Sequence, residues 1–84
     1  MFKKSEVKIL SLLFSVEEPV NKKSIALSLE TTEKTVFESV NSLLEKNLVK
    51  ITDFKGRGKF YLLTEKGVAI AGLVGQMKKI MLEE

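Results

Sequence analysis

The chain has 84 residues, of which 44% are hydrophobic and 30% charged, a balance that fits one folded domain and excludes a disordered tail. It contains no cysteine and no histidine, which excludes disulfides and zinc sites of the usual Cys/His kinds. The net charge of 14 − 11 = +3 points to a partner only if it is concentrated in one place.

The first predicted helix covers residues 5–16. Ser5 is a typical N-cap residue, and Glu6 is favourably placed near the positive end of the helix dipole. One narrow wedge of the helix is polar, formed by Lys8, Ser11 and Ser15. Because nearly all other positions are apolar, the helix is expected to pack on two sides, one against its own core and one against a partner.

A helix-turn-helix is predicted next. Pro19 ends the first helix, Val20 can add a short strand residue, and Asn21 is placed to cap a second helix over residues 22–29. Only residues 30–32 separate it from a third helix, and Ala26 is small enough to allow the two helices to cross closely.

The third helix is predicted to begin after the N-cap Thr32 and to end at Asn47, a residue that tolerates the left-handed conformation. Its apolar positions recur at helical spacing and are expected to face the core: Val36, Phe37, Val40, Leu43 and Leu44.

The opposite face of this helix carries the candidate DNA-reading residues, which are Lys34, Thr35, Glu38, Asn41 and Ser42. Lysine and the hydroxyls can contact phosphate, while the Asn41 amide matches adenine in the major groove. The alternative is a solvated polar face with no ligand. Four acidic residues against two basic ones between Glu30 and Lys46 count against DNA, unless Glu38 reads a cytosine amino group.

A β-hairpin is predicted from strands at residues 48–54 and 59–63, joined by a turn whose Gly56 and Gly58 supply positive φ angles. Residues 50–59 hold four basic side chains and one acidic one, so 4 − 1 = +3 accounts for the whole excess charge of the chain. The expected phosphate contacts are Lys55, Arg57 and Lys59. The alternative is a solvated loop. Val49, Ile51, Tyr61 and Leu63 are expected to face the core.

The last helix, capped by Thr64, is predicted over residues 65–82. Large apolar residues form one stripe. Val68, Ala71, Gly72 and Gly75 lie opposite, as small residues that let another helix approach. We expect the first and last helices to form a homodimer, because one small core cannot cover both apolar faces; the alternative is a helix folded back on its own domain. The predicted dimer interface comprises Leu12, Val16, Ile70, Leu73, Val74, Met77, Ile80 and Met81.

This order of elements resembles the winged helix-turn-helix transcription regulators, in particular the MarR-like, PadR-like and ArsR-like families. The resemblance covers residues 7–67 and rests on KTVF at 34–37, EKNLV at 45–49 and KFYLLTEKG at 59–67. It implies an α+β fold, mainly helical with one small hairpin, in the order α-(β)-α-α-β-β-α with a C-terminal dimerisation helix. It also implies a homodimer that binds double-stranded DNA, with the third helix in the major groove and the hairpin as the wing.

The predicted function is therefore a sequence-specific, DNA-binding transcriptional regulator. The alternative is a winged-helix module that binds another protein through its acidic third helix. An enzyme is not expected, since the carboxylates have no spacing that would form an acid/base pair and no Gly-rich phosphate loop is present. We expect a single cytoplasmic domain over residues 1–84 that needs no cofactor and binds neither metal nor membrane.

Overall fold

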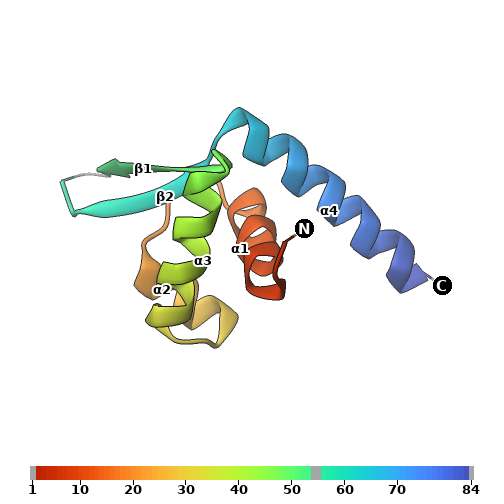
Figure 1. Cartoon of the computed structure of the whole chain (residues 1–84), viewed down its shortest axis with the longest axis horizontal. Coiled ribbons are helices and arrows are strands. Elements are labelled where there is room, and N and C mark those ends of the chain that lie inside the picture. Colours follow the sequence, from red (N-terminus) through yellow and green to blue (C-terminus); the bar gives the residue numbers. More distant parts are fainter. Residues whose placement is uncertain (1, 54–55, 84) are drawn as a thin grey trace.

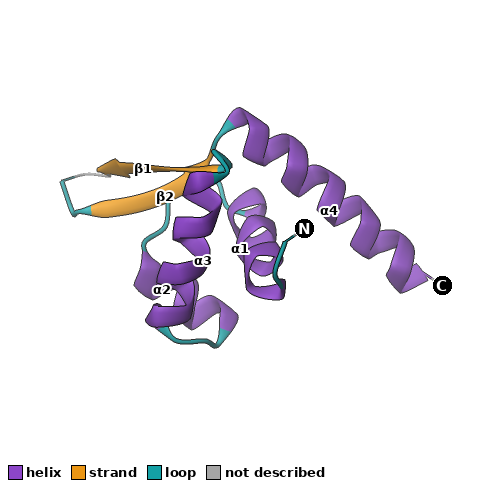
Figure 2. Cartoon of the chain, in the orientation of Figure 1, coloured by secondary structure: helices purple, strands orange, loops and turns teal. Residues whose placement is uncertain are grey.

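The computed structural model describes residues 2–53 and 56–83, with side chains described for residues 2–53 and 56–74. Helices α1 (Lys4–Ser15), α2 (Lys22–Leu29) and α3 (Glu33–Glu45) precede the antiparallel strands β1 (Val49–Asp53) and β2 (Lys59–Leu63), and helix α4 (Glu65–Glu83) follows. The predicted fold class and element order are confirmed. Figure 1 shows α1, α2 and α3 clustered beside the hairpin, from which α4 runs outward, and Figure 2 shows the short loops between them.

Local capping defines where three of the helices begin. The side chains of Asn21, Thr32 and Thr64 each accept a hydrogen bond from the backbone N–H three residues later, at 2.8, 3.2 and 3.0 Å. After α3, Asn47 has a φ of 61°, the left-handed conformation predicted for it. These sequence predictions are confirmed. They could be made from the sequence because each feature depends on neighbouring residues alone.

The start of α1 differs from the prediction. The helix begins at Lys4, so Ser5 lies in its first turn and does not cap it. The Ser5 hydroxyl instead shares a 2.7 Å hydrogen bond with the Ser39 hydroxyl of α3, and the Glu6 carboxylate accepts from the Lys3 backbone N–H at 2.9 Å. The Ser5 hydroxyl is therefore used in a tertiary contact with α3, and the Glu6 carboxylate caps the start of the helix by accepting the Lys3 N–H.

The hairpin is anchored at its base. Val49 pairs with Leu63 and Asp53 with Lys59. Val20, predicted as a short strand residue, forms an isolated antiparallel bridge to Tyr61. Gly56 and Gly58 have φ angles of 68° and 102°, as the turn chemistry predicts.

Ile51 is 46% exposed, so its predicted place in the core is wrong. The hairpin projects beyond the helices, and alternation along β1 cannot show how far the core extends beneath it (Figure 1).

The core lies between the three N-terminal helices and is closed by the hairpin base and α4. Its fully buried large apolar side chains are Ile9, Leu10, Ile25, Val36, Val40, Leu43 and Leu48. On α4, Ala71 is 1% exposed and Gly72 lies against the Phe14 ring of α1. The predicted approach of a helix to the small face of α4 is confirmed at these two positions. In the described part of the chain, no helix has the length and apolar character needed to cross a membrane.

Candidate nucleic-acid interface

The outer face of α3 points away from the core and brings together three of the predicted base-reading residues, Lys34, Glu38 and Asn41, all of them exposed. We define this outer face as the exposed residues of α3, which are Glu33, Lys34, Phe37, Glu38, Asn41 and Glu45. It presents an ammonium, an amide and carboxylates from one rigid helix, which is the chemical set that reads base edges.

The other two predicted residues of α3 lie on its flank toward α1 and are half-buried. Thr35 is hydrogen-bonded to Thr32, with 3.0 Å between their hydroxyl oxygens, and it lines a pocket of about 230 Å³ together with Lys4 and Lys8 of α1. The Ser42 hydroxyl donates to a Glu6 carboxylate oxygen at 2.9 Å. A DNA contact by Ser42 would have to share or exchange that bond.

Glu6 is the centre of a cluster that joins α1 to the end of α3. Its side chain is 2% exposed and forms a 2.9 Å ion pair with Lys46, whose own side chain is 42% exposed. The Lys46 ammonium also lies 4.9 Å from the centre of the Phe2 ring. Burial alone would raise the pKa of Glu6, but the hydrogen bonds from Lys3, Lys46 and Ser42 hold that pKa below its ordinary value of 4.5.

This cluster was missed in the sequence, although one signal was present. Glu6 precedes Ile9, Leu10 and Leu13 at spacings of three, four and seven residues, so it lies on the core stripe of α1. A carboxylate on such a stripe needs partners inside the fold. The sequence could show that need, but not that Ser42 of α3 and its C-cap residue Lys46 are the partners.

Replacing Glu6 with alanine should lower the free energy of unfolding by about 2 kcal/mol at neutral pH, because the Lys3 N–H, Ser42 and Lys46 lose their acceptor. A lowered pKa in the folded state stabilises the protein above the ordinary pKa of 4.5, and this contribution is lost as the pH falls below it. The deficit measured by urea denaturation should therefore shrink in acid. The exposed Glu17→Ala is the control; a Glu6→Ala deficit that is as small as that of the control at pH 7 would contradict this role.

Phe37 does not lie in the core, contrary to the prediction. Its side chain is 49% exposed, and the Lys22 ammonium at the start of α2 lies 4.8 Å from the ring centre. On the helix it is one turn before Asn41 and adjoins Lys34, at the edge of the apolar arc. The core is filled by Val36 and Val40, so this edge position is left on the outer face.

The wing carries a cluster of basic side chains. Arg57 and Lys59 are exposed, as is Lys50 on β1, while Lys55 lies outside the described residues. Asp53 is the acidic residue of this segment, and its carboxylate accepts from the Gly58 backbone N–H at 3.2 Å. The aspartate thus shapes the turn beside the basic residues.

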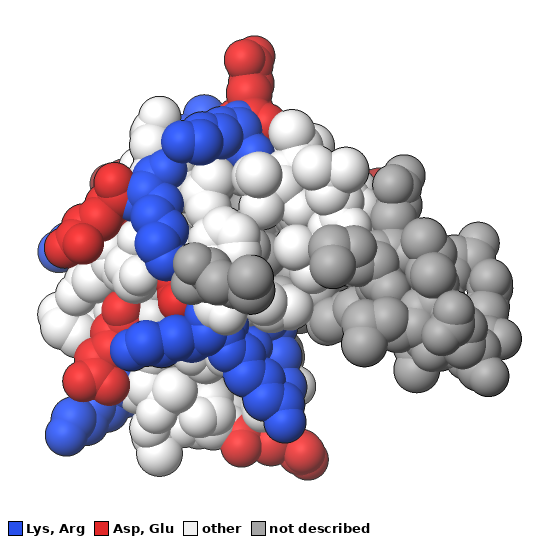
Figure 3. All heavy atoms as spheres, turned by 45° about the vertical axis from the view of Figure 1, so that its right-hand side comes forward, with Lys and Arg blue, Asp and Glu red and all other residues white. Residues whose placement is uncertain are grey.

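Charge elsewhere on the surface is mixed. On the face shown in Figure 3, Lys and Arg side chains are interspersed with Asp and Glu side chains. The outer face of α3 is itself acidic, with Glu33, Glu38 and Glu45 against Lys34, because Lys46 is paired with Glu6. Any attraction to phosphate would therefore have to come mainly from outside this face, and the wing carries a local excess of basic side chains.

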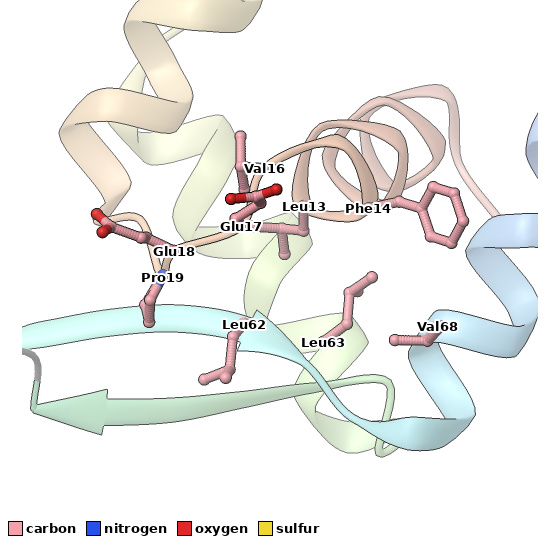
Figure 4. Close-up of a pocket in the computed structure, with 9 residues that line it drawn as sticks. All are labelled: Leu13, Phe14, Val16, Glu17, Glu18, Pro19, Leu62, Leu63 and Val68. Carbon is pink, nitrogen blue, oxygen red and sulfur yellow. The ribbon is translucent and has the colours of Figure 1, made fainter.

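A pocket of about 240 Å³ lies away from α3, between the end of α1, β2 and the start of α4. Figure 4 shows Leu62 and Leu63 from β2 below the end of α1, Val68 on α4, and Glu17 and Glu18 in the segment after α1. Its walls are largely apolar.

The predicted dimer residues whose side chains are described lie at the margin of the core or on the surface. Leu12, Val16, Ile70 and Val74 are half-buried, and Leu73 is 57% exposed. The side chains of Met77, Ile80 and Met81 lie outside the described residues. The described part of the stripe therefore presents one large, mostly exposed leucine beside side chains that the core covers only in part.

The fold is similar to that of several solved transcription regulators. A ZitR mutant from Lactococcus lactis superposes with a TM-score of 0.89 and 25% identity over 99% of this chain and 57% of that one. AdcR from Streptococcus pyogenes gives 0.87 and 20% over 98% and 60%, and Staphylococcus aureus MepR bound to ethidium bromide gives 0.83 and 20% over 98% and 61%.

A further match, from Rhodococcus, is described as a MarR-family transcriptional regulator and gives a TM-score of 0.81 at 21% identity. The chain spans about 57–61% of the first three structures. No family model and no curated protein sequence matches it. The similarity confirms the winged helix-turn-helix fold that the sequence resemblance implied, in its MarR-like form.

Proposed function

We propose that this chain is a cytoplasmic, sequence-specific DNA-binding transcriptional regulator that places α3 in the major groove and the wing on the phosphate backbone. The observation that carries the proposal is the joint exposure of Lys34, Glu38 and Asn41 on the outer face of α3, opposite the core. Its fold, similar to that of solved regulators, supports the same docking geometry.

The wing and the outer face of α3 differ in charge, and we propose that they have different roles in DNA binding. The wing residues Arg57 and Lys59, with Lys55 beside them in sequence, give a sequence-independent attraction to phosphate. The outer face adds discrimination, since Asn41 matches adenine, Glu38 accepts from the cytosine amino group, and Lys34 matches guanine. Carboxylates on this face also repel phosphate, which penalises any site where Glu38 finds no cytosine.

Thr35 and Ser42 belong to the flank of this site. Their hydroxyls are half-buried and hydrogen-bonded to Thr32 and Glu6, so we propose that they contact phosphate at the edge of the groove while keeping α3 in register with α1. The ion pair of Glu6 with Lys46 joins α1 to the C-terminal end of α3.

We also propose a homodimer formed by α1 and α4, through the interface residues named above. A two-fold dimer would set two recognition helices about 34 Å apart and require a roughly palindromic site. The exposed Leu73 and the half-buried Leu12, Val16, Ile70 and Val74 support this arrangement.

A second function is favoured by one observation, the excess of carboxylates on the outer face of α3. That face could bind a basic surface of another protein without contacting DNA. Salt separates the two functions, because release of counterions from phosphate makes DNA affinity fall steeply as salt is raised.

The wing tests the proposal directly. Replacing Lys55, Arg57 and Lys59 together with alanine should weaken binding to all duplexes alike, and the slope of log affinity against log salt should become shallower by about 0.9 for each phosphate that the wing no longer neutralises. Fluorescence anisotropy with labelled duplexes at several salt concentrations measures both quantities.

Single variants provide a matched comparison. Lys59 and Lys66 are both exposed, but Lys66 lies at the start of α4. Lys59→Ala should change the slope and Lys66→Ala should not. A triple wing variant whose slope equals that of the parent protein would remove the wing from the mechanism.

A further inference from the structure

Phe37 is the aromatic residue of the outer face of α3, and its exposure is unusual for so large an apolar side chain. Every other residue of that face is charged or an amide, and Phe37 lies in the same turns as Lys34 and Asn41. Its side chain is 49% exposed although the core beneath α3 is filled. The ring is therefore not needed to complete the core.

The side chain of Lys22 contacts this ring. Its ammonium lies 4.8 Å from the ring centre, within the range of a cation–π interaction, and it comes from the first residue of α2. In a helix-turn-helix the first helix crosses the DNA backbone while the second enters the groove. The same lysine can thus order the ring and face phosphate.

The chemistry of the major groove supplies a partner for an ordered apolar group. Thymine is the base that displays a methyl group there, and phenylalanine is among the side chains that contact it. The charged and amide groups of α3 can form hydrogen bonds with base donors and acceptors, but these groups form no hydrogen bond with the thymine methyl.

We propose that Phe37 contacts thymine methyl groups in the major groove and gives the protein a preference for A·T pairs beside the bases read by Lys34 and Asn41. This inference rests on the proposed function, and it names thymine as a further base that the site recognises. Among the exposed large apolar residues of the described chain, Phe37 is the one on α3. A lone ring among polar groups fits a methyl better than it fits a protein interface, whose centre is a continuous apolar patch.

The experiment first enriches duplexes with the full chain from a pool that carries a randomised segment of about three helical turns. The enriched duplex is then synthesised with deoxyuridine replacing thymidine at one position at a time, which removes only the methyl. Affinity is measured for the parent protein and for Phe37→Ala, with Leu27→Ala as control because Leu27 is 72% exposed on α2.

For the parent protein, uracil at one or two positions should weaken binding about threefold to fivefold, the effect of leaving one methyl group unburied. For Phe37→Ala the ratio of thymine to uracil affinity at those positions should fall to about one, while Leu27→Ala should keep the parent ratio. Because each ratio is taken within one variant, a general loss of stability cancels.

Three results would overturn the inference in distinguishable ways. Equal affinity of the parent protein for thymine and uracil at every position would show that no methyl is read, while leaving the DNA-binding function standing. An unchanged ratio in Phe37→Ala would assign methyl recognition to another residue. Failure to enrich any duplex would contradict both the proposed function and this inference, and would favour a role for Phe37 in binding another protein.

Discussion

Replacing Gly67 with alanine is expected to destabilise the protein by roughly 3 kcal/mol. Gly67 lies in the first turn of α4, where that helix meets the end of α3. A Cβ atom placed on it would overlap the backbone carbonyl oxygen of Leu48, and it would stand 2.9 Å from the carbonyl carbon and 3.2 Å from Leu63 Cδ2. The same carbonyl accepts from the Thr64 backbone N–H at 3.0 Å, so it cannot move without breaking that bond.

Gly72 provides the control on the same helix. Among the described residues, a Cβ there would meet the Phe14 ring alone, at 3.8 Å, which is ordinary contact. Gly72→Ala should therefore be neutral or stabilise the protein by up to about 1 kcal/mol through helix propensity. Urea denaturation of both variants measures the difference. If the two variants are equally stable, Leu48 does not hold α4 as closely as described.

Replacing Leu73 with glutamate is expected to abolish both the proposed homodimer and specific DNA binding. Leu73 is 57% exposed on the α4 stripe, so a charge there leaves the monomer intact but opposes burial against a second copy. A dimer that joins two half-sites gains its specific affinity from both recognition helices, and each monomer alone retains one. Sedimentation and anisotropy on the same samples should show both effects although no residue of the outer face has changed.

Leu27→Glu serves as the matched control for assembly, since it places the same charge at a residue that is 72% exposed on α2. Its sedimentation should equal that of the parent protein. A parent protein that sediments as a monomer at micromolar concentration while binding one half-site tightly would contradict the dimer and assign α4 to intramolecular packing.

The parts of the fold that the sequence predicted correctly depend on local chemistry. Asn21, Thr32 and Thr64 cap helices by bonding to residues three positions away, and the left-handed Asn47 ends α3 within the same segment. The turn of the wing likewise follows from two glycines with positive φ. No long-range contact is needed to infer any of these features.

The predictions that failed, or that sequence could not make, depend on distant partners. Ser5 has the residue type of a cap, but Ser39 of α3 shares its hydrogen bond, and Glu6 fits a dipole contact although Lys46 and Ser42 surround it. Phe37 and Ile51 fit apolar patterns, yet each stays about half exposed because the neighbouring elements cover it only in part. Periodicity assigns a residue to a face, but only tertiary packing decides which part of that face is buried.

Binding of double-stranded DNA by α3 and the wing can be tested through the salt dependence of affinity for an enriched duplex. We expect tight binding to that duplex, weaker binding to a scrambled duplex of equal length, and a linear fall of log affinity with log salt for both. Asn41→Ala should reduce the difference between the two duplexes by about 1 to 3 kcal/mol. Affinity that is weak, equal for both duplexes and insensitive to salt would contradict DNA binding by α3 and the wing and favour a protein partner for the outer face of α3.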